Sequence, residues 1–509
     1  MEKVVERWGC FEVALKGPSE GNPFLEHEVK GRFCGREESV CCEGFYDGEG
    51  IYRVRFMPSF EGEYDYEIEA DFLEEPLLGN MLVTAPREGN HGPVRVTGKH
   101  HFAYEDGTSY YPVGTTCYVW NLQGEELMKE TLASLKSAGF NKLRFCTLPK
   151  HFDYNLHEPS SYPYEGTPMD SLVLTNDNYY DYTGDKGGNH FDKLRLNPEH
   201  FRQIERCILS LQELGIEADL ILMHPYDRWG FSQMSRREDE LYWRYCIARF
   251  AAFRTVWWSL ANEYDLLHEK SLLDWEFYAG LLVEKDPYRH LRSIHHCVYP
   301  YDYSRPWVTH CSLQCPAEEA SSYRMRYGKP VVVDEMTYEG NLPWPWGNIS
   351  GEEMVRRFWA VTIQGAYPGH GETYLGHKGN LGGRAADILW WSHGGKLYGE
   401  SYKRVRFLHA FLSETPGLGL SPDRDMFNVP MASPEGEGAD PKSCYVLYFG
   451  IMQPAEAVVE INKDTPYRVE RIDTWNMTIE DMGVHFGRFH IPMPGRQYMA
   501  LRLIREEKE

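Results

Sequence analysis

Apolar and polar residues alternate in short runs through the first hundred positions of the chain. The stretches "HEVKGRF", "GIYRVRFMP" and "GEYDYEIEADF" place an apolar side chain at nearly every second position, and Gly and Pro residues separate them. A two-residue period is typical of strands that bury one face. Residues 1–98 are therefore predicted to form an immunoglobulin-like β-sandwich, without the Cys…Trp…Cys framework of antibody domains.

The spacing of apolar residues along the chain changes over residues 99–418. Short apolar runs such as "NKLRFCTLP", "EADLILMHPYD", "TVWWSLANEYD" and "KPVVVDEM" indicate buried strands. Stretches such as "NPEHFRQIERCILSLQELGI", with apolar residues at three- and four-residue intervals, lie between them and indicate amphipathic helices. Eight strand–helix units over roughly 300 residues predict a (β/α)8 TIM barrel.

A doubly wound α/β sheet is the alternative for this middle part. It would need a glycine-rich phosphate-binding turn after the first strand, and "TTCYVWNLQG" is not one. After position 418 the strand pattern returns in "SCYVLYFG", "AEAVVEI", "YRVERIDTW" and "QYMALRLI". Residues 419–509 are therefore predicted to form a second, smaller β-sandwich.

Composition limits the partners of the protein. Lys and Arg total 53 against 76 Asp and Glu, a net charge of −23, and so negative a surface repels nucleic acid. No apolar run of about 18 or more residues is present, so no membrane-spanning helix is expected. The 34 Tyr and 14 Trp suit a carbohydrate partner, because aromatic rings stack on apolar sugar faces, although large cores also use them.

The cellular location is predicted from the N-terminus and the cysteines. The stretch "MEKVVERWGCFEVALKG" has no basic start followed by an apolar run, so no secretory signal is expected. The 12 cysteines are scattered without CxxC pairs, which favours reduced thiols in the cytoplasm. The flanking β-domains either pack on the barrel or form a subunit contact, and in the second case the protein would be a homo-oligomer.

Two of the predicted buried strands end in carboxylates. "WWSLANEYD" delivers Glu263 at the tip of the fourth strand, and "KPVVVDEMTYEG" delivers Glu335 at the tip of the seventh. In a TIM barrel these ends meet at the catalytic face. Two convergent carboxylates serve glycoside hydrolysis, in which one is protonated and the other ionised. Asp334 is the rival of Glu335, and alternation along the strand lets only one of the two point into the barrel mouth. Asp265 and Glu339, further along loops, are expected to be solvated or to contact substrate.

These motifs resemble those of a known family. Asn262-Glu263 on strand four and Glu335 on strand seven are similar to the pattern of clan A retaining glycoside hydrolases. The stretches "VGTTCYVWNL" and "GAYPGHGETYLGH" resemble the apiosidase-like (DUF4038-type) subgroup. The flanking domains are similar to the DUF5060 and DUF5605 types that accompany it. The resemblance covers essentially the whole chain.

The resemblance implies roles for individual residues. Glu263 matches the clan's general acid/base and Glu335 its nucleophile. Asn262 matches the asparagine that binds the sugar 2-hydroxyl, and Arg144 the arginine that supports the nucleophile. His224 sits where the clan lines the subsite of the scissile sugar.

Further aromatic and imidazole side chains are candidates for substrate binding. The tryptophans match subsite platforms, and one of the adjacent pair is expected to be buried. The histidines on strands five and six are expected to contact the nucleophile or substrate, although the clan more often has a tyrosine on strand six. These candidates are Trp120, Trp390, Trp391, His295, His296 and His310.

No cofactor and no metal is expected, because the histidines show no HxH or HExxH spacing. The glycine-rich "HKGNLGGR" lacks the ending of a phosphate loop and is predicted to be a mobile active-site loop. A long Tyr-, Asp- and Asn-rich loop over residues 151–192 is predicted to close one end of the cleft.

The function expected from the residues and the resemblance is that of a retaining glycoside hydrolase. The long loop favours exo-action on short oligosaccharides or plant glycosides. An endo-acting glycanase with an open cleft is one alternative. A non-catalytic carbohydrate-binding protein is the other, but it would not need both Glu263 and Glu335.

Overall fold

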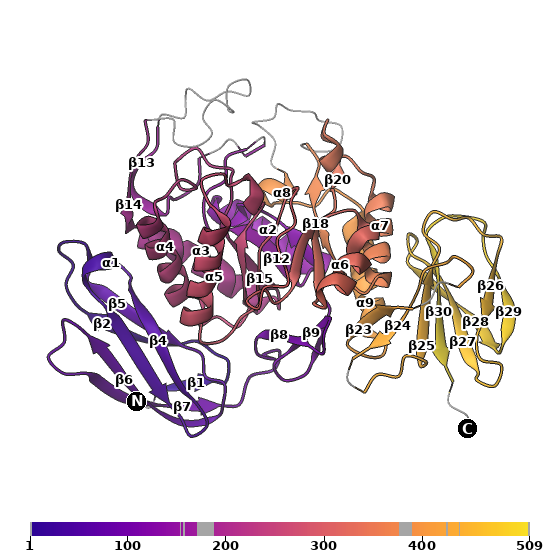
Figure 1. Cartoon of the computed structure of the whole chain (residues 1–509), viewed down its shortest axis with the longest axis horizontal. Coiled ribbons are helices and arrows are strands. Elements are labelled where there is room, and N and C mark those ends of the chain that lie inside the picture. Colours follow the sequence, from indigo (N-terminus) through magenta and orange to yellow (C-terminus); the bar gives the residue numbers. More distant parts are fainter. Residues whose placement is uncertain are drawn as a thin grey trace.

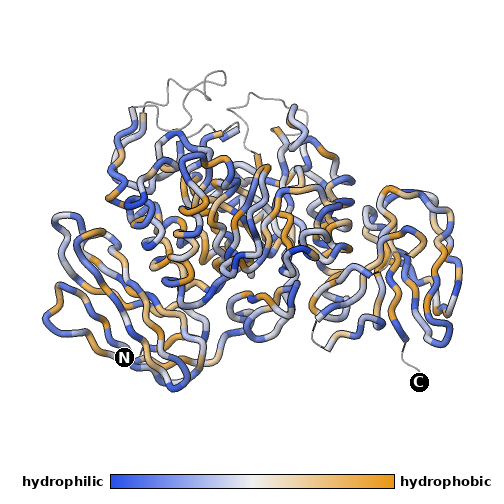
Figure 2. Tube along the Cα trace, in the orientation of Figure 1, coloured by the Kyte–Doolittle hydropathy of each residue, from blue (hydrophilic) through white to orange (hydrophobic). Residues whose placement is uncertain are grey.

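A computed structural model describes residues 3–506, apart from 153, 156–157, 170–187, 376–388, 424–425 and 437. Figure 1 shows a central barrel between a β-sheet domain at the N-terminal end and another at the C-terminal end. Hydrophobic segments lie along the barrel strands and inside each of the two flanking β-domains, while the outer helices carry hydrophilic residues (Figure 2). The predicted fold class, a TIM barrel with two flanking β-domains, is confirmed.

The N-terminal domain is built on seven strands in the order β1-β7-β6-β3-β4-β5-β2. Strand β4 pairs with β3 through residues 39–43 and with β5 through residues 44–46, so it passes from one half of the sheet to the other. Phe33 and Phe56 stack in the core between the halves, with ring centroids 4.4 Å apart. The elements are β1 Val4–Glu6, β2 Phe11–Lys16, α1 Pro23–Glu26, β3 Val29–Cys34, β4 Ser39–Tyr46, β5 Ile51–Phe56, β6 Gly62–Ala70 and β7 Leu77–Thr84.

A small three-stranded sheet follows, formed by β8 Val94–Thr97, β9 His101–Tyr104 and β10 Ser109–Tyr110. The expected domain border after residue 98 falls inside the β8–β9 hairpin. Phe102 of β9 packs under the barrel against Trp257 and His310, at centroid distances of 5.2 and 5.8 Å. The hairpin therefore covers the amino end of the barrel, opposite the catalytic face.

The barrel consists of eight parallel strands in the order β17-β16-β15-β12-β11-β21-β19-β18. A parallel bridge between His295 and Ser312 joins the two ends of this order and closes the barrel. The strands are β11 Gly114–Thr116, β12 Lys142–Cys146, β15 Glu217–Met223, β16 Val256–Ala261, β17 Arg292–Ser293, β18 Cys311–Gln314, β19 Val331–Glu335 and β21 Tyr367–His370.

Helices surround the barrel strands (Figure 1). Their starts follow from local sequence: Ser235 and Ser271 each form a capping box, and Asn197 caps a helix that begins with Pro198. Residues 294–310, all of them described, connect strands five and six without a helix. The helices are α2 Glu125–Ala138, α3 Pro198–Glu213, α4 Arg236–Phe250, α5 Leu272–Lys285, α6 Ala320–Tyr327, α7 Gly351–Ile363, α8 Trp390–His393 and α9 Ser401–Ser413.

Shorter elements decorate the carboxyl end of the barrel. They are the hairpin β13 Tyr164–Thr167 and β14 His190–Leu196, the parallel pair β20 Glu339–Gly340 and β22 Glu372–Thr373, and the 3-10 helices η1 Trp120–Leu122, η4 Tyr264–Leu266, η5 Ala317–Glu319 and η6 Pro345–Gly347.

The C-terminal domain has a six-stranded and a two-stranded sheet, which enclose an apolar core that includes Val459, Val469 and Leu501. The larger sheet has the order β23-β24-β25-β30-β27-β28, and β26 pairs with β29. The strands are β23 Gly419–Pro422, β24 Met431–Glu435, β25 Cys444–Tyr448, β26 Glu456–Glu460, β27 Tyr467–Asp473, β28 Thr478–His485, β29 Arg488–Pro492 and β30 Met499–Arg505.

Ionic contacts join the flanking domains to the barrel. Buried Arg249 of α4 donates to Asp47 at 2.8 Å and to Glu205 at 3.0 Å, which ties the N-terminal domain to α3 and α4. On the other side Glu435 of β24 contacts both Arg324 and His101. In the described part of the chain, no helix has the length and apolar character needed to cross a membrane.

Candidate active site

The two predicted carboxylates share one cavity at the carboxyl end of the barrel. Glu335 is the last residue of β19, and Glu263 follows β16 by two residues. The cavity has a volume of about 550 Å³, a size that is ordinary for small-molecule sites. Its other lining residues include Tyr118, Lys150, Tyr226, Gln314, Trp346 and Trp391.

The backbone at Glu263 is in the left-handed region, with φ 52° and ψ 55°. Few non-glycine residues adopt this conformation, and it costs about 1–3 kcal/mol where the surrounding fold imposes it. The chain turns here from strand β16 into the 3-10 helix η4. Because of this turn the side chain of Glu263 reaches the cavity instead of continuing along the strand.

Arg144 and Asn262 connect the two glutamates. Nη1 of Arg144 donates to Oε1 of Glu335 at 3.2 Å and to Oδ1 of Asn262 at 2.7 Å. The Nδ2 of Asn262 in turn donates to Oε2 of Glu263 at 3.0 Å. The hydroxyl of Tyr118 donates to Glu335 as well. Arg144 and Asn262 are buried, so these hydrogen bonds act in a region of low dielectric constant.

Glu263 has the environment of an acid that keeps its proton near neutral pH. Burial raises the pKa of its carboxyl to about 7, and the nearby charge of Glu335 adds to the effect. The hydroxyl of Tyr226 donates to Oε2. The amide of Gln314, in the orientation that satisfies its partners, donates to Oε1 at 3.1 Å. The nearby charge of Glu335 thus helps to keep Glu263 in its acid form.

Lys150 lies in an aromatic box inside the cavity. Its ammonium is 3.4 Å from the ring centroid of Tyr118 and 4.4 Å from those of Tyr226 and Trp391. These distances are those of cation–π contacts. Burial lowers the pKa of Lys150 to about 8. Its charge lies close enough to Glu263 to oppose the rise in the pKa of that carboxyl.

Asp334, the rival of Glu335, points the other way. Its carboxylate accepts from Lys142 at 2.9 Å inside the barrel, and Lys142 also pairs with Asp219 at 2.5 Å. The hydroxyl of Ser312 donates to the second oxygen of Asp334. Alternation along β19 thus sends Asp334 into a buried ionic cluster and leaves Glu335 to the cavity.

The three candidate tryptophans occupy different environments. Trp391 lines the cavity, and the centroid of its ring is 5.1 Å from that of Trp346. Trp390 is buried beside it and donates through Nε1 to the hydroxyl of Thr115 at 2.9 Å. Trp120 is fully buried in η1 against Phe145. One member of the adjacent pair is therefore at the cavity, while Trp120 belongs to the core.

Of the candidate histidines, His295 lies nearest the glutamates. Its Nδ1 accepts from the backbone N–H of Glu263 at 3.4 Å, and its Nε2 is 3.9 Å from Oε1 of Glu335. Burial and Arg144 hold the pKa of His295 well below its ordinary value, so the ring is neutral. Because Nδ1 accepts, Nε2 carries the proton and faces Glu335.

The other candidate histidines are buried and do not line the cavity. The Nε2 of His224 faces the carbonyl of Leu148 at 3.3 Å, and His296 contacts the hydroxyl of Tyr303 at 3.0 Å. His310 precedes β18 and packs on Trp257 and Phe102 at the amino end of the barrel. The expected contact of His310 with the nucleophile or substrate was wrong, because β18 begins after this residue and leaves His310 at the end of the strand opposite the cavity.

Neither of the two loop carboxylates lines the cavity; Asp265 is half-buried, whereas Glu339 is buried and not solvated as predicted. Asp265 accepts the backbone N–H groups of residues 297–299. Glu339 is buried behind the cavity next to Glu372. Both carboxylates therefore have protein partners that the sequence pattern did not reveal.

Sequence reasoning missed several cavity residues that have a recognisable position. Tyr118, Lys150 and Tyr226 follow the first, second and third barrel strands by a few residues. Position just beyond a barrel strand is itself a signal for an active-site residue. The predicted glycine-rich loop lies outside the described residues, as does much of the predicted long loop. Of that long stretch, Phe152 lines the cavity.

Comparison with known proteins agrees with this geometry. Residues 96–414 match the family model "Apiosidase-like, catalytic domain", residues 4–71 the domain of unknown function DUF5060, and residues 433–504 the domain of unknown function DUF5605. No curated protein matches the sequence.

Solved structures show the same relationship. A "putative glycoside hydrolase" from Bacteroides vulgatus ATCC 8482 is 35% identical, with a TM-score of 0.88 over 99% of this chain and 100% of that chain. A glycoside hydrolase family 5 protein from the same organism is 14% identical, with a TM-score of 0.58 over 82% of this chain and 94% of that chain, and shares the fold. The chain therefore belongs to the apiosidase-like family and is a glycosidase, with a DUF5060 domain before its barrel and a DUF5605 domain after it.

Proposed function

We propose that the protein is a retaining glycoside hydrolase of clan A type, with Glu335 as nucleophile and Glu263 as acid/base. The observation that carries this proposal is the pair of glutamates in one cavity, linked through Arg144 and Asn262. The links through Arg144 and Asn262, together with the effect of Glu335 on the pKa of Glu263, support two carboxylates that lie close together, as the acid/base and nucleophile of a retaining enzyme do.

In the first step Glu335 attacks the anomeric carbon while Glu263 protonates the departing oxygen. The bond between the anomeric carbon and this oxygen breaks, and a covalent glycosyl-enzyme forms. In the second step Glu263, now ionised, takes a proton from water, and this water displaces Glu335. Arg144 and Tyr118 stabilise the carboxylate of Glu335 before attack and after release, because both donate hydrogen bonds to it.

The remaining contacts with the sugar follow from the position of each side chain. Asn262 is proposed to bind the 2-hydroxyl, since its amide lies between the two glutamates. Trp391 is proposed as a stacking platform. Lys150 offers an ammonium inside the cavity, where it can donate to a substrate oxygen. Arg144 stays behind the nucleophile as a supporting group.

We also propose exo-action on short oligosaccharides or plant glycosides. The cavity volume of about 550 Å³ supports a site that encloses a small ligand instead of a long chain. Incubation with a reduced oligosaccharide series tests this mode of action. Release of monosaccharide from one end is expected, whereas early products of mixed length would identify an endo-acting enzyme.

A cytoplasmic location is a further part of the proposal. All 12 cysteines are free thiols, including the buried Cys117, Cys146 and Cys246. This state suits a reducing compartment. Fractionation of cells of the source organism, followed by immunoblotting, tests it. Recovery of the protein from the medium would contradict it.

Proton NMR of the first product tests the mechanism. Wild-type protein is mixed with a panel of aryl α- and β-glycosides, including pentosides, and the anomeric signal is read before mutarotation. Retained configuration for one preferred sugar is expected. Inverted configuration would overturn the assignment of Glu335 as nucleophile. Sugar affinity without turnover, unchanged in Glu335→Ala, would instead identify a carbohydrate-binding protein.

A further inference from the structure

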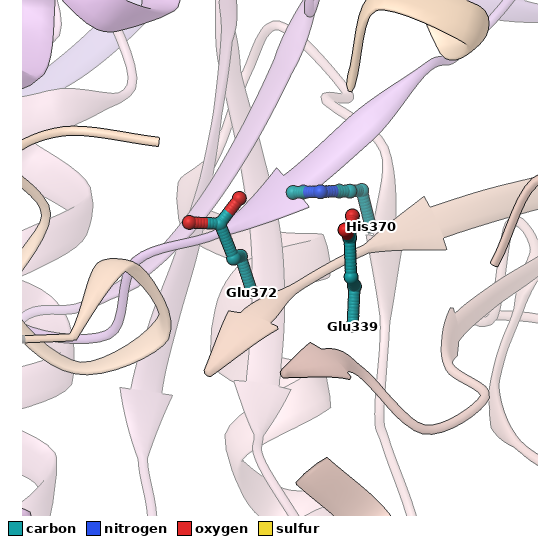
Figure 3. Close-up of side chains that lie close together, drawn as sticks. All are labelled: Glu339, His370 and Glu372. Carbon is teal, nitrogen blue, oxygen red and sulfur yellow. The ribbon is translucent and has the colours of Figure 1, made fainter. Parts of the chain in front are cut away.

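Three buried side chains meet behind the active-site cavity without a role in the proposed chemistry. Glu339 begins β20, His370 ends β21 and Glu372 begins β22, and the two carboxylates and the imidazole gather around one space (Figure 3). One ligand atom of each side chain lies within 4.8 Å of the others. Their exposed fractions are 1%, 0% and 1%. None of the three lines the cavity.

The two carboxylates are direct cross-strand neighbours, because Glu339 and Glu372 pair in the parallel register of β20 and β22. Like charges in this position repel each other unless something compensates them. Both also border Gly399, where an added Cβ would come within 2.6 Å of Oε2 of Glu372 and still closer to Glu339. A glycine at position 399 lets the two carboxylates approach each other this closely.

Backbone N–H groups at the start of α9 hold both carboxylates in place. Glu372 accepts from residue 398 at 2.5 Å and from residue 399 at 2.7 Å. Glu339 accepts from residue 400 at 2.9 Å and from residue 401 at 3.0 Å. A helix N-terminus supplies the equivalent of about half a positive charge. The hydroxyl of Tyr374 donates to Glu339 as well, at 3.1 Å.

His370 has one ring nitrogen bound and the other open. Its Nδ1 contacts Oγ1 of Thr115 at 2.9 Å, and the same oxygen accepts from Nε1 of Trp390 at 2.9 Å. Its Nε2 has no hydrogen-bond partner among the described residues, although it is completely buried. Such an atom calls for an explanation. Neutral imidazole is the form of histidine that binds metals.

We propose that Glu339, His370 and Glu372 bind one divalent transition-metal cation, Zn²⁺ or Mn²⁺. The donor set of one imidazole nitrogen and carboxylate oxygens suits these ions. The cation balances the two carboxylates, and the lone pair on Nε2 gains a partner. If Nδ1–H donates to Thr115, that lone pair is on Nε2, and this second contact fixes the tautomer.

The ion is structural in this position. Glu339 follows Tyr338, which lines the cavity, and His370 reaches Trp390, the neighbour of the cavity residue Trp391, through Thr115. The ion would therefore join β20, β21, β22 and the start of α9 directly behind one wall of the cavity. This proposal does not depend on the glycosidase mechanism, and either can fail without the other.

The test uses the full-length protein stripped with a chelator and titrated separately with Zn²⁺ and Mn²⁺ in a calorimeter. His370→Asn removes Nε2 but keeps a polar atom near the position of Nδ1. His310→Asn is the matched control, because His310 is also buried and its Nδ1 contacts a threonine hydroxyl, that of Thr309, at 3.0 Å. Wild type and His310→Asn should bind one equivalent of at least one of the two ions. In His370→Asn, affinity should fall by about 10–100-fold or more.

A second measurement covers the case in which His370→Asn fails to fold. Stripped wild-type protein is mixed with one equivalent of Co²⁺, and a visible absorption band of the bound ion is expected, which one equivalent of Zn²⁺ removes. No heat and no band up to about 1 mM metal, an affinity too weak for a structural site, would overturn the proposal. Equal affinity in wild type and a folded His370→Asn would overturn it too. The carboxyls would then share a proton instead.

Discussion

The side-chain amide of Asn262 donates to the carboxyl of Glu263, the next residue along the chain, at 3.0 Å. The side-chain oxygen of Asn262 accepts a hydrogen bond from Arg144, which also donates to the carboxylate of Glu335. Asn262 therefore connects the proposed acid with the proposed nucleophile through hydrogen bonds, the second of them by way of Arg144.

Asn262→Ala should lower kcat by about 10²-fold, because Glu263 loses the contact that orients it and small displacements of a catalytic group have effects of this size. Steady-state kinetics on the preferred aryl glycoside measures the loss. Asn121→Ala is the control: Asn121 is also buried and donates to the carbonyl of Cys146 at 3.1 Å, but it does not line the cavity. Equal losses of kcat in folded samples of both variants would contradict the orienting role.

The pH profile of kcat/KM should fall through about pH 7 on its basic side. Glu263 must be protonated to release the leaving group, and the pKa of its carboxyl is raised to about 7 by burial and by Glu335. Below that pH the acid form dominates, and above it the acid form is lost. A basic limb near the ordinary range of a glutamate, about pH 4–5, would count against Glu263 as the acid.

Lys150→Met should move this basic limb to higher pH. The positive charge of Lys150 lowers the pKa of Glu263, so its removal lets that pKa rise further. Lys150→Arg keeps the charge and should leave the limb near its original position. Both variants are compared by kcat/KM over a pH series. A limb that does not move in Lys150→Met would show that the two groups are not coupled.

Small anions should distinguish the roles of the two glutamates. Glu263→Ala loses about 10²–10⁴-fold in turnover. With an activated aryl leaving group and azide, it should regain activity and yield a glycosyl azide of retained configuration, because azide attacks the glycosyl-enzyme without a base. Glu335→Ala has no nucleophile, so any azide product should be inverted. Glu318→Gln, at the exposed rim of the cavity, is the control and should retain normal turnover. Azide products of the opposite configuration would mean that Glu263 is the nucleophile and Glu335 the acid/base.

Substitutions of the two adjacent tryptophans should change different properties: substrate binding for Trp391 and the stability of the fold for Trp390. Trp391→Ala removes a cavity wall and should raise KM about tenfold, which corresponds to about 1.4 kcal/mol. Trp390→Phe removes the buried hydrogen bond to Thr115 and should lower the free energy of unfolding by about 1–3 kcal/mol, with a smaller effect on KM. Kinetics and urea unfolding on both variants measure the two effects. The reverse pattern would show that the platform is Trp390.

The sequence by itself determined the three-part fold and the pair of carboxylates. A change of apolar period near residue 99 and its reversal near residue 418 mark the barrel, because strand and helix periods follow from backbone geometry alone. Glu263 and Glu335 were predictable because they end strands of the same barrel, and a closed parallel barrel brings all such ends to one face.

Only the tertiary structure decided which other side chains join them. His310 and Trp120 lie next to barrel strands in the sequence, yet one is at the amino end and the other in the core, since a shift of a few residues along a strand exchanges the two environments. Lys150, Tyr226 and Gln314 come from three separate loops or strand ends, and nothing in their local pattern states that they meet. Periodicity reports which face of an element is buried, but a binding site depends on long-range contacts and on the burial that shifts a pKa, and these exist only when the chain has folded.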